Sequence, residues 1–369
     1  MRYTRVIPPV ALLTATLTAC THTTAPTFNP TPHPTQPAQA VIIAGSPDDY
    51  RPPRDGDYAV RSSAQSDGGL TVDPNTGLTY YRTVGSADPH IARIERDGRL
   101  TTFRVRNPGD QLAIAGGKLW IMSSAKALRL SRVSLSDLRE QDVLRSDGGR
   151  APQIMGPSGR PLAAGRQKQM NHAWEGARFT VRGDGVPVIV TRGGELFEVA
   201  GTGKLRQWAP VGYEAAVRKV AGTGELRPRD VSADERRGLV VLGVRGLVHV
   251  RADGAASAVR FPASTEKTPP WSAVAPLTGG SVLLLGGTSA FQREPRPVLV
   301  RPDGTLELLA FGGPAWCDQF DGTLAAVASA EPGGLAQAPD GSYVLSDKNC
   351  GRVYRFRLPE NLSGSTYRG

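Results

Sequence analysis

Short segments in which apolar and polar residues alternate recur along most of this 369-residue chain. Each segment is bounded by Gly, Asp-Gly or Pro-containing turns, and groups of segments repeat roughly every 40 residues. Apolar residues at helical spacing are nearly absent. The pattern therefore predicts an all-β protein built from repeats.

Each repeat supplies strand-like runs in a constant order. A first run is followed by a short apolar second run, then by a third run ending in Asp-Gly, and then by a fourth. Asp-Gly suits a two-residue hairpin in which both positions take positive φ. About six such units fit the chain, which predicts a single β-propeller of about six four-stranded blades. The alternative is another all-β array, such as a pair of sandwiches. The clearest first strands are 68–74, 227–235, 271–277 and 333–340.

Three stretches resemble NHL repeats, most fully FGGPAWCDQFDGTLAAVASAEPGGLAQAPDGSYVLSDKNCGRVYRFRLP at 311–359. The stretch at 217–243 resembles the family moderately, and EVAGTGKL at 198–205 matches its outer strand. The resemblance runs from a Gly-bounded outer strand through a small-residue linker to a Pro-Gly strand and an Asn-x-Gly-Arg-Val strand. It implies a β-propeller over most of residues 40–359.

The last repeat contains only three strands before the chain ends, which would leave an exposed sheet edge. AQAVIIAG, near the start of the expected domain, ends in Ala-Gly as the outer strands before Gly201 and Gly222 do. We therefore expect residues 38–44 to form the outer strand of the last blade and to close the ring. The alternative is that they pack as a stray arm.

The N-terminus reads as an export signal, because Arg2 and Arg5 precede a short apolar run. Leu-Thr-Ala-Cys at 17–20 resembles the lipobox of bacterial lipoproteins, which implies a lipid on Cys20; ordinary signal cleavage is the alternative. We expect a lipoprotein signal peptide at 1–20, a Thr/Pro-rich tether at 21–38 and the propeller at 39–369. These features predict a membrane-anchored, extracytoplasmic protein.

The formal net charge is +10, from 44 Lys and Arg, of which 7 are Lys, against 34 Asp and Glu. The arginines are spread singly through the chain, which argues against a nucleic-acid-binding face. This Arg-rich usage resembles actinobacterial surface lipoproteins. We expect the membrane, a protein or an anionic cell-envelope polymer as partners, no nucleic acid, and a monomer.

Propeller topology places connections on two faces. The connections from an outer strand to the next inner strand, and from a second to a third strand, lie on one face, which we call the loop face. The tight hairpins lie on the opposite, hairpin face. Cys317 and Cys350 both fall in loop-face connections, so we expect a disulfide between them.

Long connections on a rigid scaffold commonly carry binding residues. The longest, at 146–175, contains His172 and Trp174, while Trp271 and Trp316 lie at other loop-face connections. We expect these four residues on a ligand-binding face. Alternatively, Trp271 and Trp316 fill space between blades, and the 146–175 insertion is only a linker.

Candidate catalytic residues are scarce. His90 and His172 are weak candidates for a catalytic base, and His249 alternates with apolar neighbours as a strand residue would. No His-x-His or His-Glu-x-x-His pair is present. Streptogramin lyases and regucalcin-like lactonases are also exported propellers, but their catalytic constellations cannot be placed on this sequence. No cofactor is expected except possible Ca²⁺. Weak ligand candidates for Ca²⁺ are Asp230, Asp234, Asp318 and Asp321.

Three functions fit these observations. The leading hypothesis is a lipid-anchored, non-catalytic binding or scaffold module for protein or cell-envelope ligands. The second is a hydrolase or lyase, lactonase-like or streptogramin-lyase-like, with a site at the channel mouth near His90 or His172. The third is a purely structural envelope protein.

Overall fold

The computed structural model describes most of the chain between Ala38 and Ser363, and nothing is described of the N-terminal residues before 34. The described residues are 34, 38–46, 52–64, 69–83, 90–107, 109–125, 127–146, 152–163, 166, 170, 173–234, 238–262, 271–277, 279–286, 297–309, 320, 322–324, 327 and 330–363.

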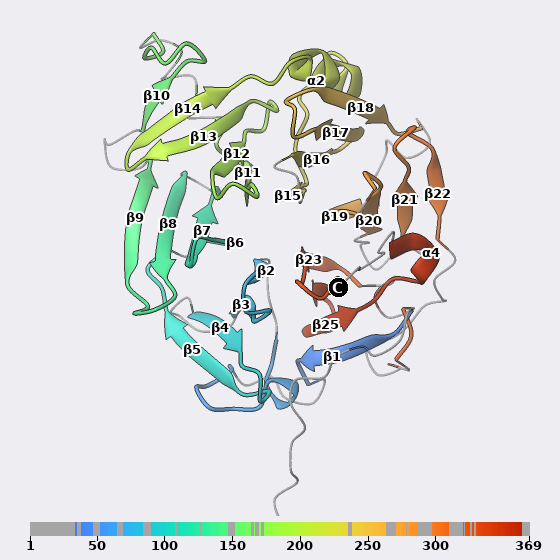
Figure 1. Ribbon diagram of the computed structural model, residues 1–369. Helices are drawn as coiled ribbons and strands as arrows, with labels where there is room; N and C mark the ends of the chain where they lie inside the picture. The colour runs from blue at the N-terminus through green and yellow to red at the C-terminus, as the bar shows by residue number, and fades with distance from the viewer. Residues whose placement is uncertain are drawn as a thin grey trace, which may run out of the picture.

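Six antiparallel blades form a ring around a central axis (Figure 1), which confirms the predicted all-β propeller. The strands are given from the innermost to the outermost. Blades 1 to 3 comprise β2 (Leu70–Val72), β3 (Thr79–Thr83), β4 (His90–Ile94) and β5 (Leu100–Arg104); β6 (Gln111–Ala115), β7 (Lys118–Ser123), β8 (Arg129–Ser134) and β9 (Glu140–Arg145); and β11 (Arg178–Val181), β12 (Pro187–Val190), β13 (Leu196–Gly201), β14 (Lys204–Trp208) and β10 (Gln153–Met155). Blades 4 to 6 comprise β15 (Asp230–Ala233), β16 (Leu239–Gly243), β17 (Gly246–Val250) and β18 (Ala256–Arg260); β19 (Trp271–Pro276), β20 (Val282–Gly286), β21 (Val298–Val300) and β22 (Leu306–Leu308); and β23 (Pro332–Gln337), β24 (Tyr343–Asp347), β25 (Arg352–Phe356) and β1 (Ala40–Ala44).

The N-terminal strand closes the ring, as the sequence predicts. β1 pairs antiparallel with β25, with Ala40 opposite Phe356 and Ala44 opposite Val353. In Figure 1 the blue strand β1 lies beside the red strand β25. β1 therefore runs from the hairpin face to the loop face and completes blade 6 from the opposite end of the chain.

The core consists of six buried clusters in the described residues, one in each seam between neighbouring blades. The second strand β16 shows how the sequence produces this arrangement. Val240 and Leu242 pack toward blade 5, while Leu239 and Val241 pack toward blade 3. Because both faces of a blade are covered by its neighbours, the middle strands are continuously apolar although their side chains alternate in direction.

The hairpins between third and fourth strands differ from the predicted two-residue turns. Between β17 and β18, only Gly254 has positive φ, at 81°. Asp253 instead accepts a hydrogen bond from the Ala255 amide at 2.8 Å, and the Gly254 amide bonds to the Arg251 carbonyl at 2.9 Å. This is a longer turn that ends in a left-handed residue, so Asp contributes its side chain rather than an unusual backbone conformation.

Several segments expected to be plain connections cover the outer edges of blades. β10, from the 146–175 insertion, adds a fifth strand parallel to β14. The helix α2 (Tyr213–Ala221) covers β18, and Lys219 Nζ donates to the Ala258 carbonyl at 3.2 Å. Such covering removes unpaired strand edges that would favour association with other chains.

Two short helical turns complete the described structure. They are the 3-10 turn η1 (Ala59–Arg61) and the helix α4 (Glu360–Ser363). No helix among the described residues is long and apolar enough to cross a bilayer.

Candidate binding site

The innermost strands enclose a central cavity of about 1040 Å³. This volume lies at the upper end of the range typical of small-molecule sites. The lining comes from all six blades, because each blade presents its first strand to the axis. The cavity is therefore a product of ring closure and not of any single repeat.

Two arginines from neighbouring blades meet at the loop-face mouth of this cavity. Arg178 begins β11 and Arg229 directly precedes β15, and both line the cavity. Arg178 Nε donates to the Arg229 carbonyl at 2.6 Å, so its side chain reaches across the seam between blades 3 and 4. Neither guanidinium forms an ion pair within the described part of the chain.

The pKa of the Arg229 guanidinium is lowered, first by burial and then by the positive charge of Arg178. The Arg229 side chain is nevertheless reached by solvent. The Arg229 side chain is partly desolvated and still exposed because it lies in a concave site, where the protein walls displace part of its hydration shell without covering it. The pair of like charges is unfavourable in this setting, because the one carboxylate beside it, Asp230, offsets only one of the two charges.

Asp230 lies beside this pair and joins blades 4 and 5. Its Oδ2 accepts a hydrogen bond from the Val274 amide of β19 at 2.9 Å, and Oδ1 accepts one from the Val231 amide at 2.8 Å. Burial raises the pKa of Asp230 to about 6, although the two amides and Arg178 act in the opposite direction. Because both oxygens are engaged by backbone amides, the carboxylate acts as a tie between blades.

Asp234 lies at the opposite end of the same strand, toward the hairpin face. Its Oδ1 accepts a hydrogen bond from the Gly238 amide at 2.6 Å, and Oδ2 lies 3.4 Å from His249 Nε2. The separation of four positions between Asp230 and Asp234 corresponds to about 13 Å in a strand, too far for the two carboxylates to share an ion. No group of three or more potential ligands in the described residues could hold a metal ion.

His90 does not reach the cavity. It begins β4, the third strand of blade 1, where it lies opposite Thr83 and Arg104. The lining of the cavity contains no histidine among the described residues. The predicted arrangement of His90 beside a carboxylate at the channel mouth is therefore absent from this part of the structure.

The two described tryptophans of the expected ligand-binding face are buried. Trp174 is 1% exposed and meets the Phe197 ring edge-on, with centroids 5.4 Å apart. Trp271 is 5% exposed and packs in the same way on Phe261, at 4.8 Å. Both fill seams between blades, which is the space-filling alternative that the sequence left open for Trp271. For Trp174 the expectation of a ligand-facing position is corrected.

The remaining candidate residues lie outside the residues that the structure describes, so their roles stay predictions. They are Cys20, His172, Trp316, Cys317, Asp318 and Asp321. Cys350 is described, in the turn between β24 and β25 on the loop face, where the predicted bridge to Cys317 requires it.

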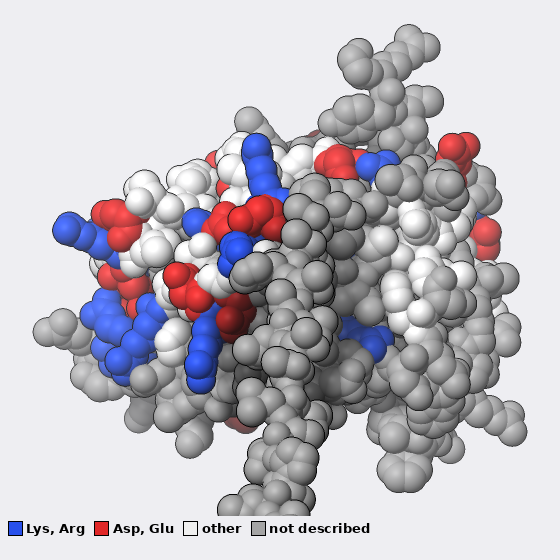
Figure 2. Space-filling view, turned by 90° about the horizontal axis from the view of Figure 1, so that it is seen from below, with Lys and Arg blue, Asp and Glu red and all other residues white. Residues whose placement is uncertain are grey.

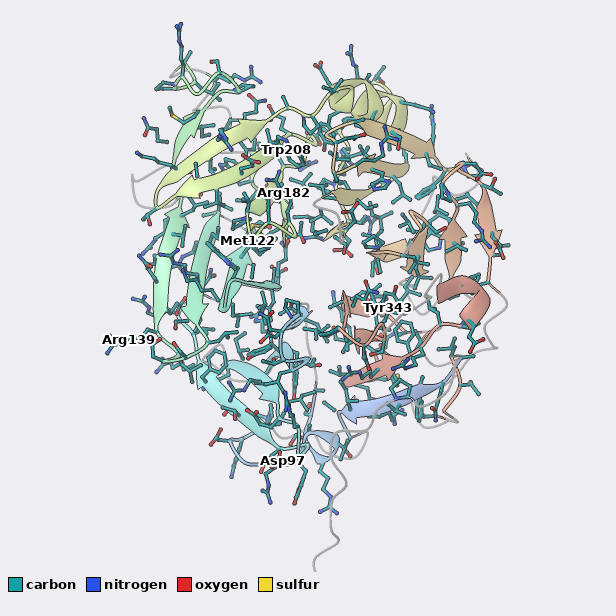
Figure 3. The ribbon with its side chains drawn as sticks, in the orientation of Figure 1. Asp97, Met122, Arg139, Arg182, Trp208 and Tyr343 are labelled. Atoms are coloured by element: carbon teal, nitrogen blue, oxygen red, sulfur yellow. The ribbon has the colours of Figure 1, made fainter. Side chains whose placement is uncertain are left out.

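A second hollow, of about 550 Å³, lies between blades 3 and 4. Its centre is Arg182, whose guanidinium stacks on Trp208 at 4.5 Å (Figure 3). Arg182 also pairs with Asp184 and Glu198, each at 2.9 Å, and Arg206 pairs with Glu198. These charges satisfy one another, unlike those of Arg178 and Arg229.

Charged side chains on the described part of one edge of the ring are mixed in sign. Figure 2 shows basic and acidic groups next to one another on that edge, not separated into patches. The net positive charge of the chain therefore does not produce a continuous basic surface there.

The sequence reasoning missed Arg178 and Arg229. The available signal was an arginine at the start of the inner strand in two consecutive blades, in RFTV and RDVSA. This signal can be interpreted only when it is known that the first residues of β11 and β15 lie at the same mouth of the cavity.

No protein-family model matches the chain, and no curated protein matches it. Among solved structures, a protein of unknown function from Bacteroides thetaiotaomicron is similar, with a TM-score of 0.56 and 9% identity over 86% of this chain and 75% of its own. A gluconolactonase from Xanthomonas campestris is also similar, with a TM-score of 0.51 and 11% identity over 91% of this chain and 99% of its own. At these identities the likeness shows the propeller fold alone, and the NHL and lipoprotein resemblances stay predictions.

Proposed function

We propose that this protein is a non-catalytic binding module that takes its ligand into the central channel from the loop face. The observation that carries the proposal is the cavity of about 1040 Å³ with polar groups from several blades at its mouth. Preformed cavities of this size with a few convergent polar groups are the usual form of a ligand site. The partner class remains a protein segment or a cell-envelope polymer that presents a group small enough to enter.

The chemistry at the mouth favours binding over catalysis. Asp230 is the one cavity-lining carboxylate with a raised pKa in the described residues, and such a shift often marks a functional group. Its two oxygens, however, accept backbone amides from β15 and β19. A general base needs a free oxygen within reach of the substrate proton.

Blocking the channel tests the proposal. Thr180 lines the cavity on β11, whereas Thr202 is exposed in the hairpin between β13 and β14. We expect the purified protein to retain a ligand from envelope extract, Thr180→Trp to lose it, and Thr202→Trp to keep it. Equal retention by both variants would place the ligand outside the channel.

Deleting the 146–175 insertion would be a poor test of the same idea. Ile154 and Met170 from this segment are 1% and 4% exposed, in the seam between blades 2 and 3. Their removal would damage the core, so any loss of binding would follow from lost stability.

Hydrolysis of a lactone is the second candidate function. Two observations favour it: the raised pKa of Asp230 inside the cavity and the similarity of fold to a gluconolactonase. Hydrolysis of gluconolactone by the purified protein, lost in Asp230→Asn and kept in Asp97→Asn, would support this candidate. A rate equal to the uncatalysed rate would remove it.

We further propose that a lipid on Cys20 anchors the protein on the extracytoplasmic face of a membrane. β1 begins at the hairpin face, where Ala40 lies opposite Phe356 and Arg357 Nε donates to the Pro34 carbonyl at 3.0 Å. This geometry supports a tether that leaves from the hairpin face and a channel mouth that points away from it. Metabolic labelling with a fatty-acid probe, lost in Cys20→Ala, tests the anchor.

A further inference from the structure

We infer that Arg178 and Arg229 form a binding site for an oxyanion, a carboxylate or a phosphate group, at the loop-face mouth of the channel. This inference rests on the proposed function, because it names the chemical group that the channel would take. It applies to a free small anion and to an anionic group carried by an envelope polymer.

The placement of the Arg178 and Arg229 side chains is the first argument for the site. The Arg178 Nε bond to the Arg229 carbonyl, at 2.6 Å, fixes the Arg178 side chain over the backbone that leads into β15. Its terminal nitrogens remain available at the cavity, and the Arg229 side chain enters the same lining. Guanidinium groups held in this way are suited to paired hydrogen bonds with planar carboxylates and with phosphates.

The net positive charge of Arg178 and Arg229 is the second argument for the site. Arg182 of blade 3, by contrast, is matched by Asp184 and Glu198. Arg178 and Arg229 form no ion pair among the described residues, and the single carboxylate of the neighbouring Asp230, which interacts with Arg178, offsets only one of the two charges. The mutual repulsion of the two guanidiniums contributes to the lowered pKa of Arg229. A bound anion would relieve this repulsion and replace hydration that the channel walls remove.

An unsatisfied hydroxyl supplies a third, independent observation. Ser272 lines the cavity from β19, and its Oγ is buried without a hydrogen-bond partner among the described residues. Buried polar atoms without partners are uncommon, and each calls for an explanation. Rotation of the Ser272 side chain toward the cavity would allow this hydroxyl to donate a hydrogen bond to an oxyanion between blades 3, 4 and 5.

Acidic groups also line the cavity, but their placement leaves the pair cationic. Asp230 is held by two backbone amides. Asp184 and Asp234 line the opposite, hairpin-face end of the cavity, where Asp184 pairs with Arg182 and Asp234 accepts the Gly238 amide. Asp110 comes from blade 2, which adjoins blade 3 but not blade 4, and Glu331, accompanied by Lys348, comes from blade 6. The positive charge is therefore concentrated where blades 3 and 4 meet.

The test measures phosphate binding by isothermal titration calorimetry on the full-length protein and two variants. Arg229→Gln removes one charge and leaves the Arg178 bond to the Arg229 carbonyl intact, so it should fold as the wild type does. The second variant carries both Arg178→Gln and Arg229→Gln. Arg139→Gln is the matched control, because Arg139 lies on the outer hairpin of blade 2 with its side chain 88% exposed (Figure 3).

We expect Arg229→Gln to weaken phosphate binding by roughly tenfold to a hundredfold, the usual cost of losing hydrogen bonds to a charged group. The double variant should show no measurable binding, and Arg139→Gln should stay within about twofold of wild type. Binding that is unchanged in both channel variants would overturn the inference, as would no binding to the wild type.

Two further arms separate the possible outcomes. A poly(glycerol phosphate) chain that binds much more tightly than inorganic phosphate indicates a polymer source, while equal affinity per phosphate indicates a free anion; either supports the site. If phosphate does not bind but Thr180→Trp still abolishes retention of an envelope ligand, the oxyanion site fails and the binding function stands. If phosphate binds while no envelope ligand is retained, the site stands and the proposed function fails.

Discussion

The closure of the ring depends on a close approach at Gly45, directly after β1. Gly45 has φ of +97°, and a Cβ at this position would lie 2.3 Å from the Gly351 carbonyl oxygen and 2.8 Å from Arg352 Cα. Both atoms belong to the backbone of blade 6, which cannot rotate away as a side chain can. Gly45→Ala therefore tests whether β1 and β25 meet as closely as the structure indicates.

The expected cost of Gly45→Ala has two parts. Positive φ disfavours an L-residue by about 1–2 kcal/mol, and an overlap with rigid surroundings adds about 1–3 kcal/mol. The substitution also strains the hydrogen bond from the Gly45 amide to the Ala59 carbonyl, 3.0 Å long, which joins blade 6 to the start of blade 1. We expect a loss of about 2–5 kcal/mol in the free energy of unfolding.

Gly116→Ala is the matched control, because Gly116 also has positive φ, at 56°, but no atom lies within 4 Å of the place that an added Cβ would occupy. It should lose only the conformational part, about 1–2 kcal/mol. For a folded region of some 300 residues, each kcal/mol corresponds to about 1.5 °C in Tm. Thermal unfolding followed by circular dichroism should therefore show a drop of about 3–7 °C for Gly45→Ala and about 1.5–3 °C for Gly116→Ala.

Hydrogen exchange adds a local readout. The amides of β1 and β25 should exchange faster in Gly45→Ala than in Gly116→Ala, because the clash separates these two strands first. Equal Tm values for the two variants, with unchanged exchange in β1, would refute the close approach and the account of ring closure that depends on it.

Burial raises the pKa of Asp347 to about 6 from 3.8, so the fold disfavours its ionised form, and protonation of Asp347 should add about 1 kcal/mol of stability between about pH 7.5 and pH 5. Asp230, whose pKa burial also raises to about 6, should add a similar amount, so Asp347→Asn should remove about half of the rise measured by urea unfolding. The hydrogen bonds of Ser342 and the charge of Arg355 outweigh burial and lower the pKa of Asp340 to about 2. The stability that ionised Asp340 contributes is therefore lost only below about pH 4, outside the range in which Asp347 titrates. Trp174→Ala should cost about 3–5 kcal/mol in unfolding free energy because it empties a seam between blades, whereas Trp208→Ala, at a partly exposed ring, should cost less; equal losses would contradict the seam account. Peptide mapping without reductant should recover Cys317 joined to Cys350, and recovery of both as free thiols would remove the predicted bridge.

The sequence determined the features that depend on local physical chemistry. Alternation within short segments and regular Gly-containing turns were enough to predict strands, blades and their number. The unpaired edge of the last repeat and the apolar strand at 40–44 were also visible in the sequence, so ring closure could be predicted before any contact was known. The Asp-Gly pairs marked the correct turns, although the backbone conformation of Asp was not the expected one.

Some local signals were present but were assigned to loops. Tyr213, Ala216 and Val220 have helical spacing and are all buried in α2, yet the segment is short and begins beside glycine. β10 consists of three residues, and its pairing with β14 depends on a neighbour about fifty positions away. Propensity is weak over such lengths, so tertiary contacts decided both elements.

Only the tertiary structure decided which side chains face the channel. Trp174 and Trp271 stand in loop-rich stretches, but the seams between blades need large apolar groups and bury both rings. Arg178 and Arg229 are separated by 51 positions and show no common motif, yet they meet because consecutive inner strands start at the same mouth. The sequence of a strand shows which of its faces is apolar. Whether a polar side chain points toward the channel axis depends on how the neighbouring blades pack. The sequence by itself therefore determined the ring and its closure, and the packing of blades 3, 4 and 5 decided where a ligand can bind.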